Sequence, residues 1–305
     1  MKAFVYPLWR NQYYFHPDST ANPQFLAFYH PYSWKLQTFY ELWKNASLVR
    51  LLRTMDTGSS DEFNTILKAI PDLENAVWVI DTGRHSVHRK VSGIYCGDRD
   101  ADATMRFFKL GFTRYSKDAV AREASFYKSV SHSGLTPAVF ATMNEPDYTA
   151  YVGEYISGRK LEHFEITKKI TSTIEMLSEM RFSGVINYNV NASLMVSFAH
   201  GDFCPWNILV TDDGEYKIID WEFAGVYPRG FDFLTFKIQV PFLMERRKSV
   251  AQIWMSARSE VKRYFEHYAI ENWMDYVREF ANICATRQNG GYLGKRYLEL
   301  KHWLN

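Results

Sequence analysis

The segment that most constrains this chain is FAHGDFCPWNILVTDDGEYKIIDWEFAG, residues 198–225. Its pattern is typical of a tight polar loop followed by two short strands, NILV and YKIID, with a turn between them and an acid at the end. Strands joined by such a turn run antiparallel, so Asp202, Asn207 and Asp220 are expected at one edge.

This group of side chains suits a magnesium-nucleotide site. Magnesium prefers oxygen ligands, and a further carboxylate can receive the proton of an attacking hydroxyl group. Taken singly, HGD could be a turn, Asn207 a helix cap and Asp220 a solvated strand end. Their order, spacing and flanking strands together favour the site. Cys204, inside the same segment, is interpreted as a small space-filling residue.

The pattern along the chain changes from strands to helices. Between residues 76 and 157, AVWVID, HRKVSGIYC and ATMRFFKLG predict an antiparallel meander, followed by a helix in KDAVAREASFYKSV and two further strands. Residues 158–305 are mainly helical around the polar segment. Residues 1–75 form an N-terminal extension, with an irregular arm to about residue 32 and helices over 33–55 and 61–70. The predicted class is α+β.

Composition narrows the classes of function. The chain has 305 residues with 36 Lys and Arg against 34 Asp and Glu, a net charge of +2, so no general field attracts nucleic acid or anionic lipid. The three cysteines lie far apart and show no zinc-site spacing, which favours free thiols. We recognise neither a signal peptide nor a membrane span, and the expected location is cytoplasmic.

HGDFCPWNIL followed by IIDWEFAG resembles the catalytic and metal-binding motifs of the aminoglycoside phosphotransferase and choline kinase family, relatives of protein kinases. The resemblance implies a two-lobed protein-kinase-like fold, with a small antiparallel β-rich N-lobe that binds nucleotide and a helical C-lobe that holds the catalytic loop and acceptor site. It further implies ATP as donor, Mg²⁺ as cofactor, Asp202 as catalytic base, His200 as a loop-bracing residue, and Asn207 and Asp220 as metal ligands.

The same resemblance assigns further residues. Asp232 in GFDFLTF would anchor the catalytic loop. Lys109, at the end of MRFFKLG, would bind the nucleotide phosphates and be oriented by Glu123 in the following helix. Arg122 adjoins Glu123 and is an alternative partner in the pair, although it belongs to another helix face. The alternative interpretation is that Lys109 is an exposed lysine at a strand end and Glu123 an ordinary acidic residue of a helix, with no role in nucleotide binding.

Two nucleotide contacts are predicted less directly. No GxGxxG occurs in the meander, but TGRHSVHR is similar to the looser family pattern and would place Gly83 and Ser86 near the phosphates. Gly83 could equally be a hairpin glycine. After the strand in YVGEYISG, Glu154 and Ile156 would present backbone groups to adenine.

The leading hypothesis is therefore a cytoplasmic transferase, an ATP- and Mg²⁺-dependent kinase that phosphorylates a hydroxyl of a small molecule such as a sugar, amino alcohol or glycan intermediate. A nucleotide-binding pseudokinase scaffold is the alternative. A protein kinase is disfavoured because no DFG or APE stretch follows Asp220. The sequence leaves four questions open: the identity of the acceptor, whether GTP replaces ATP, whether the acceptor is linked to a membrane, and the oligomeric state.

Overall fold

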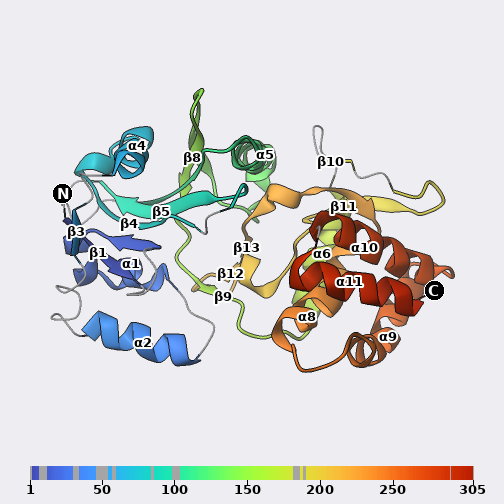
Figure 1. Ribbon diagram of the computed structural model, residues 1–305. Coiled ribbons are helices and arrows are strands. Elements are labelled where there is room, and N and C mark those ends of the chain that lie inside the picture. Colours follow the sequence, from blue (N-terminus) through green and yellow to red (C-terminus); the bar gives the residue numbers. More distant parts are fainter. Residues whose placement is uncertain are drawn as a thin grey trace. The chain divides into compact units, whose positions relative to one another are not determined.

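The computed structural model describes residues 2–6, 12–29, 34–45, 54–56, 60–83, 86–97, 104–180, 186–187, 190–288 and 290–304 (Figure 1). The chain divides into two compact units, Met1–Ser157 and Gly158–Asn305.

Unit 1 is built on one large sheet. Its strands are β1 (Lys2–Tyr6), β2 (Tyr13–Phe15), β3 (Thr54–Asp56), β4 (Val77–Asp81), β5 (Lys90–Cys96), β6 (Met105–Gly111), β7 (Val139–Asn144) and β8 (Thr149–Glu154). Its helices are α1 (Pro23–Ala27), α2 (Trp34–Asn45), α4 (Asp61–Ala69) and α5 (Arg114–Val130), with 3₁₀ turns η1 (Pro17–Ala21), η3 (Leu73–Asn75) and η4 (Ser131–Ser133). The sheet order is β3-β1-β2-β4-β5-β6-β8-β7. Every strand pairing described in this sheet is antiparallel, which confirms the predicted meander.

Both faces of this sheet are covered. Along β4, Trp78 and Ile80 enter a core shared with α4, whereas Val79 enters a second core formed with α1 and α2. Figure 1 shows α4 on one side of the sheet and α1 and α2 on the other. Successive side chains of a strand point to opposite faces, so a strand that is buried on both sides reads as the continuous apolar run VWVI.

The N-terminal residues differ from the expectation of an irregular arm to residue 32. Strand β1 pairs with both β2 and β3, and β2 pairs with β4, so the start of the chain continues the sheet. The prediction was wrong because aromatic residues and Pro were taken as signs of irregularity, although Phe4 and Phe15 are a cross-strand pair. The helices predicted over 33–55 and 61–70 are present as α2 and α4; residues 46–53 of the first prediction lie outside the described residues, and its end falls in strand β3.

Unit 2 combines helices with two small sheets. Its helices are α6 (Lys168–Glu179), α7 (Phe231–Leu234), α8 (Val240–Met244), α9 (Val250–His267), α10 (Trp273–Gln288) and α11 (Gly291–Leu304). Strands β10 (Ile186–Asn187), β14 (Gly225–Pro228) and β11 (Val196–Ala199) form one sheet, and β13 (Tyr216–Ile218), β12 (Ile208–Val210) and β9 (Arg159–Lys160) form the other. The 3₁₀ turns η5 (Pro205–Asn207) and η6 (Trp221–Phe223) flank the β12–β13 hairpin. That hairpin is antiparallel, as predicted.

A π-helical turn, η7 (Thr235–Gln239), separates α7 from α8. The N–H of Val240 donates to the carbonyl of Thr235, five residues back. Pro241 follows at once and has no N–H to donate, and its ring crowds the carbonyl of the preceding turn. The wider turn therefore lies where the sequence disfavours a regular α-helix, and such turns are frequent at functional sites.

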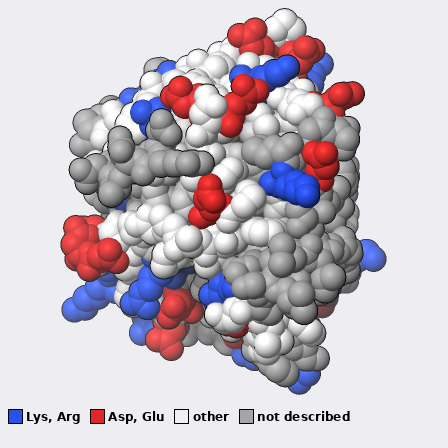
Figure 2. All heavy atoms as spheres, turned by 90° about the vertical axis from the view of Figure 1, so that its left-hand side faces the viewer, with Lys and Arg blue, Asp and Glu red and all other residues white. Residues whose placement is uncertain are grey.

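Charges of both signs are mixed on the surface of unit 1. Figure 2 shows Lys and Arg interspersed with Asp and Glu over the described residues of the face it presents. Within the same described part of the chain, none of the helices has the length and apolar character needed to cross a lipid bilayer.

The packing of β5 predicts the effect of one substitution. A Cβ atom at Gly93 would lie 2.5 Å from the Val79 carbonyl oxygen and 2.6 Å from the Phe108 ring. Gly93→Ala should lower the free energy of unfolding by about 1–3 kcal/mol, because a strand backbone cannot yield cheaply. Urea unfolding measures this. Gly97→Ala, whose Cβ would have no described heavy atom within 4 Å, is the control, and equal stability of the two variants would contradict the packing.

Candidate active site

In unit 1, Lys109 and Glu123 form a buried ion pair. The Lys109 Nζ lies 2.6 Å from the Glu123 Oε2, and the Tyr127 hydroxyl donates to the other oxygen, Oε1, at 2.9 Å. Helix α5, which holds Glu123, begins with a capping box at Thr113. A buried charge needs its partner, and removing one member of such a pair costs about 3–5 kcal/mol. Arg122, the alternative partner, is exposed.

The turn after β4 explains Gly83 structurally. Gly83 has φ +69°, and a Cβ there would lie 2.4 Å from the Lys90 carbonyl oxygen. Its N–H donates to the Asp81 carboxylate at 2.8 Å. Ser86 is exposed, and its carbonyl accepts from the Arg89 N–H. Gly83 thus has a reason to be glycine within the turn itself, and a phosphate contact by Gly83 or Ser86 stays a prediction.

At the end of β8, Glu154 forms two hydrogen bonds with the backbone of Ala138. Its N–H donates to the Ala138 carbonyl at 2.8 Å, and its carboxylate accepts from the Ala138 N–H at 3.1 Å. The Glu154 N–H is therefore occupied, and a contact of the Glu154 backbone with adenine stays a prediction. Ile156 is half-buried just beyond the strand, and its contact with adenine stays a prediction.

In unit 2, Asp232 holds the loop that follows β11. Its two carboxylate oxygens accept the backbone N–H groups of His200 at 2.7 Å and Gly201 at 2.9 Å. Asp232 is 2% exposed, and burial raises the pKa of its carboxyl group, while the two N–H donors act in the opposite direction. Gly201 has φ +83°, and a Cβ there would lie 2.4 Å from the Phe223 carbonyl oxygen. The tight turn therefore requires glycine.

His200 links this loop to the β12–β13 hairpin. Its Nδ1 accepts the Asp202 N–H at 3.2 Å, so its Nε2 carries the proton and donates to the Ile219 carbonyl at 3.0 Å. The ring is fully buried and lies 4.5 Å from the Trp221 ring, centroid to centroid. These contacts join His200 to both sides of the loop, and its role as a loop-bracing residue stays a prediction.

Asp202 and Asn207 lie in contact at the end of the loop. The Asn207 Nδ2 donates to the Asp202 carbonyl at 2.9 Å and to its Oδ2 at 3.2 Å. The Asn207 carbonyl accepts the Ile219 N–H at 3.0 Å, which joins the loop to the strand that leads to Asp220. Asp220 has φ +68°, an uncommon conformation for a residue with a side chain and one that clusters at functional sites.

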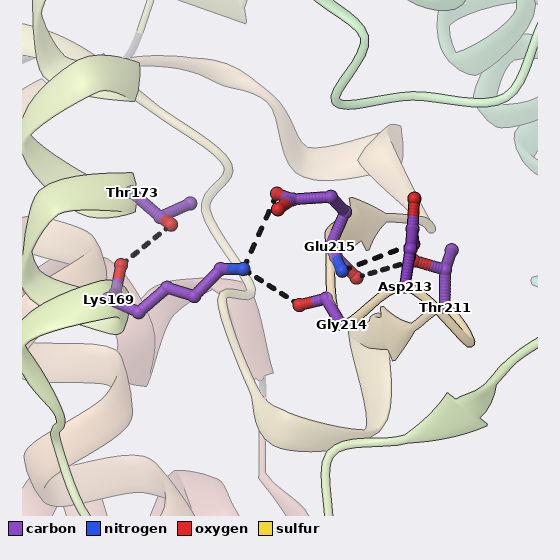
Figure 3. A network of polar contacts seen from close by, with 6 residues as sticks. All are labelled: Lys169, Thr173, Thr211, Asp213, Gly214 and Glu215. Atoms are coloured by element: carbon purple, nitrogen blue, oxygen red, sulfur yellow. Dashed lines mark hydrogen bonds and ion pairs between the residues drawn. The ribbon is translucent and has the colours of Figure 1, made fainter.

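The turn of the β12–β13 hairpin is fixed to α6. Figure 3 shows Lys169 reaching the turn, where its Nζ donates to the Gly214 carbonyl at 2.7 Å and approaches the Glu215 carboxylate at 3.4 Å. Within the turn, the Thr211 hydroxyl bonds to the Asp213 carboxylate. These contacts are exposed and individually weak, but they hold the hairpin that separates Asn207 from Asp220.

Three residues near Asp202 were not anticipated from the sequence, the buried Gln239 and Tyr297 and the half-buried Arg287. Gln239 donates to the Asp202 Oδ1 at 2.6 Å, Tyr297 donates to the Gln239 Oε1 at 2.7 Å, and Arg287 donates to the Gly201 carbonyl at 2.6 Å. Gln239 stands in the apolar run FKIQVPF, where a buried amide needs a polar partner. This polar residue within an apolar run was the sequence signal that could have identified Gln239. Arg287 and Tyr297 belong to helices whose spacing in the sequence does not relate them to the loop.

The donor set fits a magnesium ion. Because the Asn207 amide nitrogen donates to Asp202, its oxygen is the atom suited to a cation, and Asp220 adds a carboxylate. Magnesium is commonly bound by one or two such ligands together with phosphates and water. Among the described residues, no group of three His, Cys, Asp or Glu side chains could hold a metal by itself. A site completed by nucleotide phosphates is compatible with that finding.

Residues 179–268 match the model of the phosphotransferase enzyme family, APH. We refer to these matched residues as the phosphotransferase-family segment. The segment contains the loop of Asp202, the β12–β13 hairpin and Asp232, which are the features that the resemblance in sequence rested on. None of the curated proteins matches the chain.

Solved structures show the fold. Choline kinase LicA from Streptococcus pneumoniae is similar with a TM-score of 0.51 and 15% identity, over 80% of this chain and 99% of that chain. A thermostable mutant of aminoglycoside phosphotransferase APH(4)-Ia, in a complex with ADP and hygromycin B, has a TM-score of 0.48 and 11% identity, over 79% and 94%. An ethanolamine kinase from Plasmodium vivax has 0.45 and 10%, over 85% and 86%. The likeness to LicA shows the kinase-like fold that accompanies the phosphotransferase-family segment.

The brace at Asp232 is tested by Asp232→Asn. The amide keeps one acceptor oxygen and directs an NH₂ group at a backbone N–H, leaving that buried donor unpaired. We expect the free energy of unfolding to fall by about 1–3 kcal/mol, as measured by urea unfolding. Asp212→Asn, on the exposed β12–β13 turn, should leave it nearly unchanged. A stable Asp232→Asn protein would contradict the bracing role.

Thiol reactivity tests the packing around the site. Cys204 and Cys284 are fully buried, and burial raises the pKa of the Cys204 thiol well above its usual value and that of Cys284 to about 11. Cys96 is half-buried. Burial also raises the pKa of the Cys96 thiol. The thiolate is the reactive form, so iodoacetamide should label Cys96 first, and its labelling should keep accelerating as pH rises through about 9.

Mass spectrometry after timed labelling identifies the modified cysteines. Labelling in urea, which should modify all the cysteines, is the positive control. Rapid alkylation of Cys204 in the folded protein would contradict the closed packing around Asp202.

Proposed function

We propose that the chain is an ATP- and Mg²⁺-dependent small-molecule kinase that phosphorylates a hydroxyl group of a sugar, an amino alcohol or a glycan intermediate. The observation that carries the proposal is the loop of Asp202, fixed by Asp232 and joined through Asn207 to the strand before Asp220. The phosphotransferase-family segment supports the reaction class.

In this proposal Asp202 is the general base. The acceptor oxygen forms a bond to the γ-phosphorus, the bond from that phosphorus to the β–γ bridging oxygen breaks, and ADP leaves with the electron pair. Asp202 receives the hydroxyl proton. Asp202 lies at the surface of its loop, partly exposed, whereas His200 and Asp232 behind it are buried. The base can therefore be reached by a substrate while its backbone stays fixed.

The remaining roles follow from the donor atoms. Asn207 and Asp220 would hold magnesium, which neutralises phosphate charge when bound. In unit 1, Lys109 would contact the nucleotide phosphates, oriented by Glu123, whose second oxygen is already fixed by Tyr127. Three free cysteines are consistent with the reducing cytoplasm that we propose as the location.

Asp202→Asn should lower kcat by a factor of about 10²–10⁴, the usual range for loss of a general base. Nucleotide affinity should be preserved, because the proposed contacts with nucleotide come from other residues. The measurement is ATP consumption against a panel of monosaccharides, amino alcohols and aminoglycosides, with and without Mg²⁺, and nucleotide binding by calorimetry.

Each outcome of this assay separates the candidates. Turnover on one class of acceptor that is lost in Asp202→Asn and on chelation of Mg²⁺ would support the kinase and identify the acceptor class. Nucleotide binding with no turnover on any acceptor would favour a pseudokinase scaffold. Asp212→Asn, on the exposed turn, is the matched control for replacing an Asp by Asn.

A further inference from the structure

The Asp202 carboxylate is held by an amide on each oxygen. The Asn207 Nδ2 lies 3.2 Å from Oδ2, and the Gln239 Nε2 lies 2.6 Å from Oδ1. The Gln239 contact is the shorter one and joins residues that are 37 positions apart. Gln239 is 2% exposed, so the bond is shielded from the competition of water, which strengthens it.

Tyr297 fixes the orientation of the Gln239 amide. Its hydroxyl donates to the Gln239 Oε1 at 2.7 Å, which leaves Nε2 to face the carboxylate. The reversed amide would place Oε1 against a carboxylate oxygen and could not accept from it. Tyr297 is fully buried, and burial raises the pKa of its hydroxyl well above the usual value, so the hydroxyl keeps the proton that it donates.

The backbone also contributes to the position of Gln239. It is the last residue of the π-helical turn, directly before Val240 and Pro241. A π turn rotates the chain less per residue than an α turn, so Gln239 lies at a different angle around the helix axis than a regular helix would give it. The second Nε2 hydrogen is also engaged, because Nε2 lies 3.4 Å from the Cys204 sulfur. The amide is therefore constrained on every polar atom.

We propose that Gln239 is a positioning residue for phosphoryl transfer, which holds the Asp202 carboxylate in one rotamer and is itself oriented by Tyr297. The proposal rests on the base role of Asp202 given above. The terminal torsion of an Asp side chain is broad, whereas a general base must lie within hydrogen-bonding reach of the hydroxyl it deprotonates. If that torsion is already fixed, the Asp202 carboxylate does not have to sample other orientations before each phosphoryl transfer.

Kinetics of Gln239→Met test the role. Met has a similar length and no amide, so the Asp202 Oδ1 loses the Gln239 donor and keeps only the weaker Cys204 thiol contact at 3.7 Å, while the site stays filled. We expect kcat to fall about 10- to 100-fold, the size of effect that small misplacements of reacting groups produce. The KM for ATP should change less than twofold, since Gln239 touches no proposed nucleotide contact. A rise in the KM for ATP with unchanged kcat would overturn the proposal.

Tyr297→Phe tests the orienting step. It removes the donor to the Gln239 Oε1 and should lower kcat in the otherwise unchanged protein. In the Gln239→Met background the same substitution should have no further effect on kcat, because there is no amide left to orient. Independent, multiplicative effects of the two substitutions would overturn the relay through Gln239.

Thr235→Val is the matched structural control. Thr235 is buried in the same π-helical turn, and its hydroxyl donates to the Phe231 carbonyl at 3.0 Å. The stability of the Thr235→Val protein, followed by thermal unfolding, should fall about as much as that of Gln239→Met, while its kcat is retained. An equal loss of kcat in Thr235→Val would show that any weakening of this turn impairs transfer, and would overturn a specific role for Gln239.

A measurement without turnover separates this proposal from the proposed function. The measurement is the NMR signal of the Gln239 side-chain NH₂ group, which is identified by its absence from Gln239→Met. This signal should shift in Asp202→Asn and in Tyr297→Phe, and should not shift in Thr235→Val. An unshifted signal in Asp202→Asn overturns the contact, even in an active kinase. Shifts as expected in a protein that transfers no phosphate to any acceptor would show that the contact exists but that the proposed function, and with it the positioning role, is wrong.

Discussion

One buried carboxylate determines the conformation of the loop on which the site depends. Asp232 accepts two consecutive backbone N–H groups, those of His200 and Gly201. Consecutive N–H groups can converge on one carboxylate only if the chain turns sharply, and the left-handed conformation of Gly201 supplies that turn. The direction in which Asp202 leaves the loop follows from this pair of bonds.

The same helical segment therefore acts on the loop twice. Asp232, in α7, holds its backbone, and Gln239, at the end of the π-helical turn, contacts its carboxylate. Arg287 in α10 and Tyr297 in α11 add contacts from the end of the chain. Residues from position 200 to position 297 thus contact the loop of Asp202 or the residues that hold it. A short motif therefore depends on several helices of unit 2.

The motif-bearing part of the site could be predicted because its geometry is local. The loop, the hairpin and the closeness of Asp202 to Asn207 follow from alternation, turn residues and spacing within 198–225, whereas the position of His200 was implied by the family resemblance. The ion pair of Lys109 with Glu123 was also accessible, since one strand and the next helix carry it. Gln239 and Tyr297 were not, because no periodicity relates helices that pack through tertiary contacts, and a π turn leaves no plain sequence signature.

The N-terminal strands show the reverse error, in which a regular element was missed because its residues resemble those of a loop. Their place in the sheet has a consequence for how the chain folds. Strand β4 acquires its neighbour on one side from β2, which lies between β4 and β1. A chain that started at residue 76 would leave β4 as a bare edge with apolar side chains on both faces, a ready template for pairing with other chains. By pairing with β4, strand β2 covers an edge that could otherwise pair with a second copy of the chain.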